Sequence, residues 1–83
     1  MEILDFYADW CGPCQMMKPV LEEFREAHPE IKVRAVNVDE EEELAVEYRV
    51  SSIPCLVVLK DGKEVNRAVG VMPLNKLEKL VEI

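Results

Sequence analysis

Basic residues are scarce in this sequence. Its 83 residues include 10 lysines and arginines against 17 aspartates and glutamates, which gives a formal net charge of -7. A protein that binds nucleic acid needs a basic surface to neutralise phosphates, so we expect no nucleic-acid partner. The acidic run at 39–43 could dock a basic partner. However, it lies where a helix is expected to begin and where acids suit the helix dipole, so we interpret it as a solvated helix start.

Long hydrophobic runs and an export signal are also missing. No apolar stretch approaches the roughly 20 residues that a membrane span needs. The first residues, "MEILDF", show no basic segment followed by an apolar stretch and a cleavage site. We therefore expect a soluble cytoplasmic protein without a membrane partner. A chain this short holds one hydrophobic core, so we expect residues 1–83 to form a single domain.

Cysteine is rare, with three residues in all, and two of them stand in a C-x-x-C pattern at Cys11 and Cys14. An odd number in reducing cytoplasm fits catalytic or metal chemistry better than a structural disulfide framework. A structural zinc site needs four ligands, and Cys55 and His28 could complete the count on paper. His28, however, lies about 20 Å from Cys14 at the far end of one helix, so we expect no metal.

Apolar spacing predicts seven elements in the order β-α-β-α-β-β-α. The first two strands are joined by a helix and should be parallel, while Asp61-Gly62 predicts a hairpin between the last two strands. The chain is therefore predicted to be an α/β protein with a four-stranded mixed sheet and helices on both faces. The strands are expected at 3–8, 31–38, 55–60 and 64–69, and the helices at 15–28, 40–49 and from about Leu74 to Val81.

The C-x-x-C pair lies at the junction of the first strand and the first helix. There Pro13 suits the first helical position, and Gly12 lets the chain turn. The free amides and the dipole of the helix N-terminus stabilise a thiolate at Cys11, which predicts that Cys11 is the nucleophile. Cys14, one turn further in, should be shielded and act second, and the two are close enough to form a disulfide.

Asp5 is an acid inside an otherwise apolar strand that runs into the cysteine pair. If it points beneath the cysteines, burial raises its pKa and makes it a plausible general base near neutral pH. The alternative is a solvent-facing residue on a one-sided strand, and the pattern alone does not separate the two.

The stretch "DFYADWCGPC" resembles the active-site segment of the thioredoxin family. "VNVD" at 36–39, "SSIPCLVVLKDGK" at 51–63 and "VGV" at 69–71 extend the resemblance over nearly the whole chain. It implies a thioredoxin-like fold, a buried base at Asp5, a helix kink at Pro19 and a cis peptide bond before Pro54. The residues that it implies for catalysis and for substrate binding are Cys11, Cys14 and Asp5, and Trp10, Gly12, Pro13, Ile53, Pro54, Gly70 and Val71.

The function implied by this resemblance is that of a thiol-disulfide oxidoreductase. It would reduce protein disulfides through a mixed disulfide, act as a monomer without a cofactor, and be recycled by a reductase of the thioredoxin-reductase type. One alternative is a glutaredoxin-like protein recycled by glutathione. A second is a non-catalytic interaction module built on the same fold, although that role leaves both cysteines unexplained.

Three departures from the family pattern qualify the resemblance. Most family members begin with an extra strand and helix, so strand 31–38 should form a sheet edge protected by Lys32 and Arg34. Ala35 stands where many members have a lysine near the buried aspartate. Cys55 replaces a common threonine, and we interpret it as a buried filler rather than a third redox thiol. Met16 and Met17 are both expected in the core.

Overall fold

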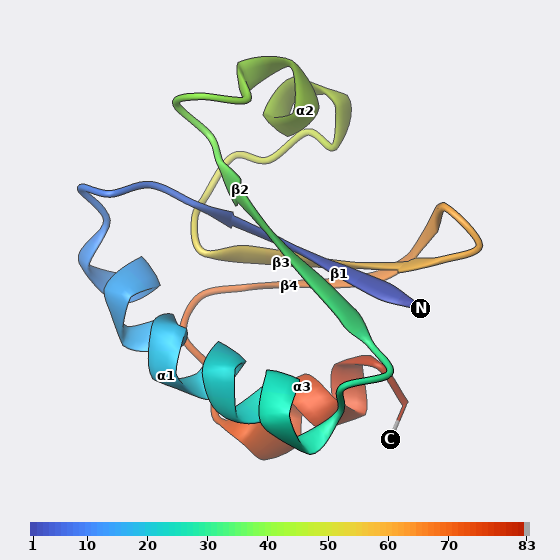
Figure 1. The fold of residues 1–83 in the computed structure, drawn as a ribbon. Coiled ribbons are helices and arrows are strands. Elements are labelled where there is room, and N and C mark those ends of the chain that lie inside the picture. Colours follow the sequence, from blue (N-terminus) through green and yellow to red (C-terminus); the bar gives the residue numbers. More distant parts are fainter. Residues whose placement is uncertain (83) are drawn as a thin grey trace.

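The computed structural model describes residues 1–82 and contains the predicted seven elements in the predicted order (Figure 1). The strands are β1 (Glu2–Tyr7), β2 (Lys32–Asn37), β3 (Cys55–Lys60) and β4 (Lys63–Val69), and the helices are α1 (Gly12–Ala27), α2 (Glu42–Glu47) and α3 (Leu74–Leu80).

The four strands form one mixed sheet in the order β2-β1-β3-β4. β1 pairs with β2 in parallel, and β3 pairs antiparallel with both β1 and β4. β3 is central, and its residues Cys55 to Leu59 are all buried, which explains its unbroken apolar sequence. β2 is an edge strand as predicted, and Lys32 and Arg34 on it are exposed.

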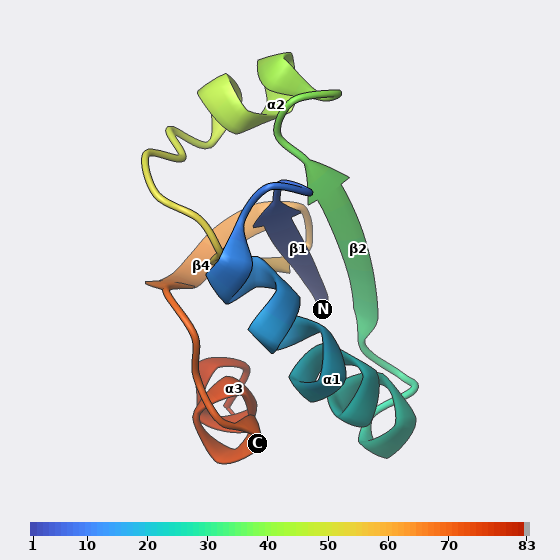
Figure 2. The same ribbon diagram turned by 90° about the vertical axis from the view of Figure 1, so that its left-hand side faces the viewer.

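Helices cover both faces of the sheet, as predicted. α1 and α3 lie on one face and α2 lies on the other (Figures 1 and 2). Because side chains alternate along a strand, Ile3 of β1 packs in the α1 and α3 core, whereas Leu4 and Phe6 pack in the α2 core. The same alternation turns Asp5 toward α1. The sheet thus separates a core under α1 and α3, with Asp5 on the same side, from a core under α2.

The hairpin between β3 and β4 confirms the Asp61-Gly62 prediction. Asp61 and Gly62 both have positive φ, at 53° and 78°. Two-residue hairpin loops favour this conformation because it matches the twist of the strands, and glycine adopts it without strain.

Two helix boundaries and one core residue differ from the prediction. α1 begins at Gly12, as the cap position of Cys11 and the placement of Pro13 indicated, and not at residue 15, where the apolar spacing begins. α2 is shorter than 40–49, since Arg49 adopts φ 52° just after it and no α2 residue is fully buried. Met17 is buried as expected, but Met16 is 63% exposed, so its assignment to the core was wrong.

Candidate active site

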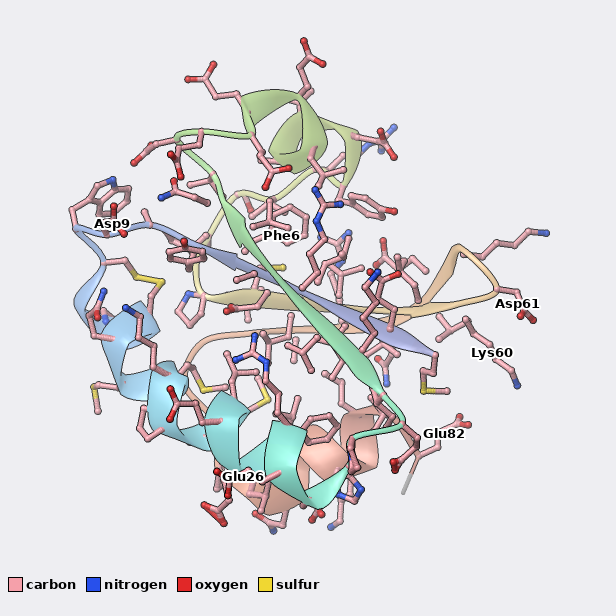
Figure 3. All side chains as sticks on the ribbon, viewed as in Figure 1. Phe6, Asp9, Glu26, Lys60, Asp61 and Glu82 are labelled. Carbon is pink, nitrogen blue, oxygen red and sulfur yellow. A yellow bond between two sulfur atoms is a disulfide. The ribbon has the colours of Figure 1, made fainter. Side chains whose placement is uncertain are left out.

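Cys11 and Cys14 form a disulfide at the start of α1, visible as the yellow bond near the loop that carries Asp9 (Figure 3). Their Cα atoms lie 5.3 Å apart. Cys11 is the N-cap residue, with extended backbone, and its Sγ accepts a hydrogen bond from the backbone N–H of Cys14 at 3.2 Å. The first turn of α1 contains no acidic residue. The helix amides and dipole therefore favour negative charge on the Cys11 sulfur.

The two cysteines are almost equally covered in this oxidised form. Cys11 is 5% exposed and Cys14 3% exposed. Cys14 is thus shielded as predicted, but burial alone does not distinguish the two sulfurs. What distinguishes them is their place in the helix, because only Cys11 occupies the capping position.

The cis-proline loop packs against the cysteine pair. The Ile53-Pro54 peptide bond is cis, as the resemblance implied. Ile53 packs on the small cluster of Ala8 and the two cysteines, and the Sγ of Cys11 lies 3.9 Å from the carbonyl oxygen of Ile53. Pro54 is buried. The backbone of Ile53 thus lies directly beside the Cys11 sulfur.

Gly70 joins this loop through the backbone. Its N–H donates a hydrogen bond of 2.8 Å to the carbonyl oxygen of Pro54, and its φ of 98° lies in the region that favours glycine. Val71 follows with an exposed side chain. Gly70 and Val71, 16 or more positions along the chain from Pro54, thus lie beside it.

Trp10 lies on the surface directly before Cys11. Its ring is 72% exposed, and its indole N–H donates a hydrogen bond of 2.8 Å to Asp39 Oδ2. The backbone N–H of Asp39 in turn donates to Asn37 Oδ1 at 2.9 Å. Our sequence interpretation placed Asp39 in an acidic run and at the end of the "VNVD" stretch, and it did not foresee this contact with Trp10. The position of Asp39 just after an apolar strand was the available signal. Gly12 and Pro13 are exposed beside Trp10.

Asp5 is buried beneath α1, which settles the alternative that the sequence left open. It is 8% exposed and, with Cys14, lines a cavity of about 310 Å³. Burial raises the pKa of Asp5 from 3.8 to about 6, while the positive charges of Arg25 and Lys18 act in the opposite direction. The carboxyl group therefore changes protonation state close to neutral pH, on the side of the dithiol where Cys14 lies.

Among residues 1–82, no three His, Cys, Asp or Glu side chains come together in a group that could hold a metal ion. His28 caps the far end of α1 instead, and its Nε2 lies 2.7 Å from Glu78 Oε2. Cys55 is a free, buried cysteine on the α2 face of the sheet, as its assignment as a filler requires. Burial raises the pKa of its thiol.

Comparison with known proteins agrees with this geometry. The thioredoxin family model matches residues 1–83. The chain belongs to the thioredoxin family. It is 49% identical to thioredoxin of Bacillus subtilis over 80 residues, covering 95% of this chain and 77% of that protein. It is 46% identical to thioredoxin of Chlamydia trachomatis over 79 residues, covering 95% and 78%.

A solved structure shows the same fold. The oxidised form of mitochondrial thioredoxin 3 from Saccharomyces cerevisiae superimposes with a TM-score of 0.90 at 34% identity, covering 99% of this chain and 77% of that one. The thioredoxin-like fold is thus confirmed. As a thioredoxin, the protein is an oxidoreductase that acts on disulfides, with a redox-active cysteine pair. Within residues 1–82, no helix is long and apolar enough to cross a membrane.

Proposed function

We propose that this thioredoxin reduces disulfide bonds of other proteins and is recycled by a reductase of the thioredoxin-reductase type. The observation that supports this most directly is that a cysteine pair, a cis-proline loop and a buried carboxyl group meet at the N-terminal end of α1. A cysteine pair at the N-terminus of α1 packs against the Ile53-Pro54 loop, and Asp5 shares a cavity with Cys14. These groups supply a nucleophile, a resolving thiol and a base for one exchange reaction.

In the first step of the proposed reaction, the thiolate of reduced Cys11 attacks one sulfur of the substrate disulfide. A bond forms between Cys11 Sγ and that sulfur, the substrate S–S bond breaks, and the other substrate sulfur leaves as a thiolate that takes a proton from water. The cap position favours Cys11 for this role, because the α1 amides stabilise its thiolate.

In the second step, Cys14 resolves the mixed disulfide. The Asp5 carboxylate accepts the Cys14 thiol proton across their shared cavity, directly or through water. The Cys14 thiolate then attacks Cys11 Sγ, the bond to the substrate breaks, and the second substrate sulfur leaves as a thiolate that is protonated. Two electrons have moved from the dithiol to the substrate, and the Cys11–Cys14 disulfide is the product.

Substrate contact is assigned to the surface around Cys11. Exposed Trp10, Gly12, Pro13 and Val71 offer side chains and backbone there, while Ile53, Pro54 and Gly70 offer backbone beside the sulfur. In this proposal an extended substrate segment lies between the exposed side chains of Trp10 and Val71. This set remains a proposal that residue-by-residue substitution can test.

The proposal also covers the domain organisation, the oligomeric state and the compartment of the protein. We infer that residues 1–83 act as a single domain and a monomer in the cytoplasm, without nucleic acid or membrane. The net charge of -7 supports the first exclusion, since it disfavours polyanions.

Insulin reduction tests the function directly. The protein is mixed with insulin and supplied in turn with a flavin-dependent reductase, a ferredoxin-linked reductase or glutathione, and precipitation of the insulin chains is followed by turbidity. We expect turnover with a thioredoxin reductase and none for the Cys11→Ser/Cys14→Ser variant. Turnover with glutathione alone would favour the glutaredoxin-like alternative. No turnover with any donor would favour the non-catalytic module.

A further inference from the structure

The base of this site has no charged partner on the neighbouring strand. Asp5 of β1 pairs directly with Ala35 of the edge strand β2, and both residues line the 310 Å³ cavity. Ala35 carries no polar group. The next residue back, Arg34, is engaged elsewhere, since its guanidinium bonds Glu41 at 2.7 Å. Any compensation of the Asp5 charge must therefore come from another element.

That element is α1. The lining of the cavity includes Lys18 and Arg25, which are separated by seven residues and so lie two turns apart on one side of the helix. Cys14 lies four residues before Lys18 on the same side. The helix thus presents the resolving cysteine and two cations to one cavity.

We propose that Lys18 and Arg25 are positioning residues that keep the Asp5 carboxyl ionised in the cavity that Ala35 leaves open, and so set the pH range in which Cys14 can resolve mixed disulfides. The proposal rests on the proposed function for its kinetic consequence, but the electrostatic part stands without it.

The Arg25 side chain reaches from α1 to the backbone of β2. Its Nη2 donates a hydrogen bond of 3.5 Å to the carbonyl oxygen of Val33. Val33 is two residues before Ala35 on β2 and pairs with Ile3, just as Ala35 pairs with Asp5. The guanidinium thus contacts β2 at Val33, two residues before Ala35 and on the same face of the strand. The guanidinium therefore lies between α1 and β2, at the cavity that Asp5 also lines, although the side chain is largely exposed.

The other ionisable groups around Asp5 do not cancel these cations. The cavity is also lined by Glu22 of α1, Asp9 of the preceding loop, Tyr7 of β1 and Cys14. Of all the charges nearby, those of Arg25 and Lys18 have the leading effects on the pKa of Asp5, and both lower it against the upward effect of burial. Without them, burial would hold the proton on Asp5 to a higher pH.

Titration of the Asp5 carboxyl by NMR in the reduced protein tests the electrostatic part. The test variant is Lys18→Gln/Arg25→Gln, and the matched control is Lys76→Gln/Lys79→Gln, which removes the same charge from α3. We expect the Asp5 midpoint to rise by about one pH unit in the test variant and to stay within about 0.2 unit in the control. Added salt should raise the wild-type midpoint, because both cations are exposed and screened. An unchanged midpoint in the test variant, or an equal rise in the control, would overturn the proposal.

The kinetic part is measured on the resolving step, as release of substrate from a preformed mixed disulfide at each pH. A rise of about one unit in the Asp5 midpoint lowers the ionised fraction at pH 6 from about one half to about one tenth, so release should slow about fivefold there and much less at pH 8. Arg25→Lys should retain the wild-type profile, and Ala35→Lys in the test variant should restore it. Slowing that is equal at all pH values would assign Lys18 and Arg25 a structural role and overturn the proposal. If instead the wild type fails to reduce insulin, the proposed function fails while the NMR result stands.

Discussion

Asp5 and Cys55 are both buried titratable groups on neighbouring central strands, yet they lie in opposite environments. Burial raises the pKa of each. Asp5 faces α1 and shares a cavity with Cys14 and two cations, whereas Cys55 faces α2 and packs with Leu4 and Phe6. A perturbed pKa thus does not identify a functional group by itself. What separates Asp5 from Cys55 is that Asp5 shares a cavity with Cys14, in which a proton can be transferred, whereas Cys55 packs among apolar side chains.

The covering helices explain the difference between the two faces. α1 has 16 residues and packs with α3, and its side chains Met17, Leu21 and Phe24 are fully buried over the sheet. α2 has six residues and none that is fully buried. The α1 face therefore combines a large core with a polar cavity at its cysteine end, while the core on the α2 face is built from apolar side chains and is covered by a short helix.

The largest effect is expected at the cysteine pair on the α1 side. Cys11→Ser should abolish disulfide reduction, and Cys14→Ser should leave a stable mixed disulfide with the substrate, because no thiol remains to attack it. Mass spectrometry of each variant after incubation with a disulfide substrate measures the adduct. An adduct on Cys11→Ser, with none on Cys14→Ser, would show that the two roles are reversed.

The second prediction compares the two cores. Leu77→Ala removes a fully buried side chain of α3 and should lower the free energy of unfolding by about 2–5 kcal/mol. Leu44→Ala removes a partly buried side chain of α2 and should cost about 1 kcal/mol, since less contact is lost. Urea denaturation with unchanged m-values measures both. Equal losses would mean that the α2 face is packed as tightly as the α1 face.

The third prediction concerns pH. The pKa of Asp5 is about 6 in the folded protein against an ordinary 3.8, so the folded state binds more protons than the unfolded state between these values. Its contribution to stability is therefore greatest below pH 3.8 and falls by up to about 3 kcal/mol as the pH rises through 6. Asp5→Asn should remove this loss. The variant should be more stable than the wild type at pH 7.5, by about 1–3 kcal/mol, and no more stable at pH 3.5.

The activity of Asp5→Asn should move the other way. Insulin reduction at neutral pH should slow, since an amide cannot accept the Cys14 proton. A variant that reduces insulin at the wild-type rate would remove Asp5 from the mechanism, even if its stability rises as expected.

The sequence predicted the strands and the two faces of the sheet, but it did not predict every helix boundary or every core residue. Alternating and continuous apolar runs predicted the strands and the two faces, and the family motif implied the cis peptide bond before Pro54. Apolar spacing alone placed the start of α1 at residue 15, because the first turn is held by the Cys11 cap, whereas Pro13 and the C-x-x-C junction indicated the earlier start that the structure shows. Met16 was misassigned because it stands next to Met17, but a helix turns about 100° per residue, and in α1 this rotation points Met17 into the core and Met16 toward solvent.

Contacts between distant segments were the hardest to foresee. The hydrogen bond from Trp10 to Asp39 joins residues 29 positions apart, and no local pattern encodes it. The approach of Arg25 to Asp5 depends in the same way on how α1 lies over β2. Burial of Asp5 followed from the pattern only as one of two alternatives, since an acid in an apolar strand fits either face.

The smallest effect is expected at Cys55, on the α2 side. In the folded, reduced protein its thiol should stay unlabelled by an alkylating reagent while Cys11 reacts, because a desolvated thiol keeps its proton. Cys55→Ala should retain most activity and lower stability by about 1 kcal/mol, the effect of a small void among apolar side chains. Cys55→Ser is the matched control, and it should cost more, since it places a hydroxyl among the apolar side chains that pack on Cys55. Labelling by mass spectrometry, before and after unfolding, decides the point. Rapid labelling of native Cys55, or a disulfide formed by it, would make it a third redox thiol and erase the contrast with Asp5.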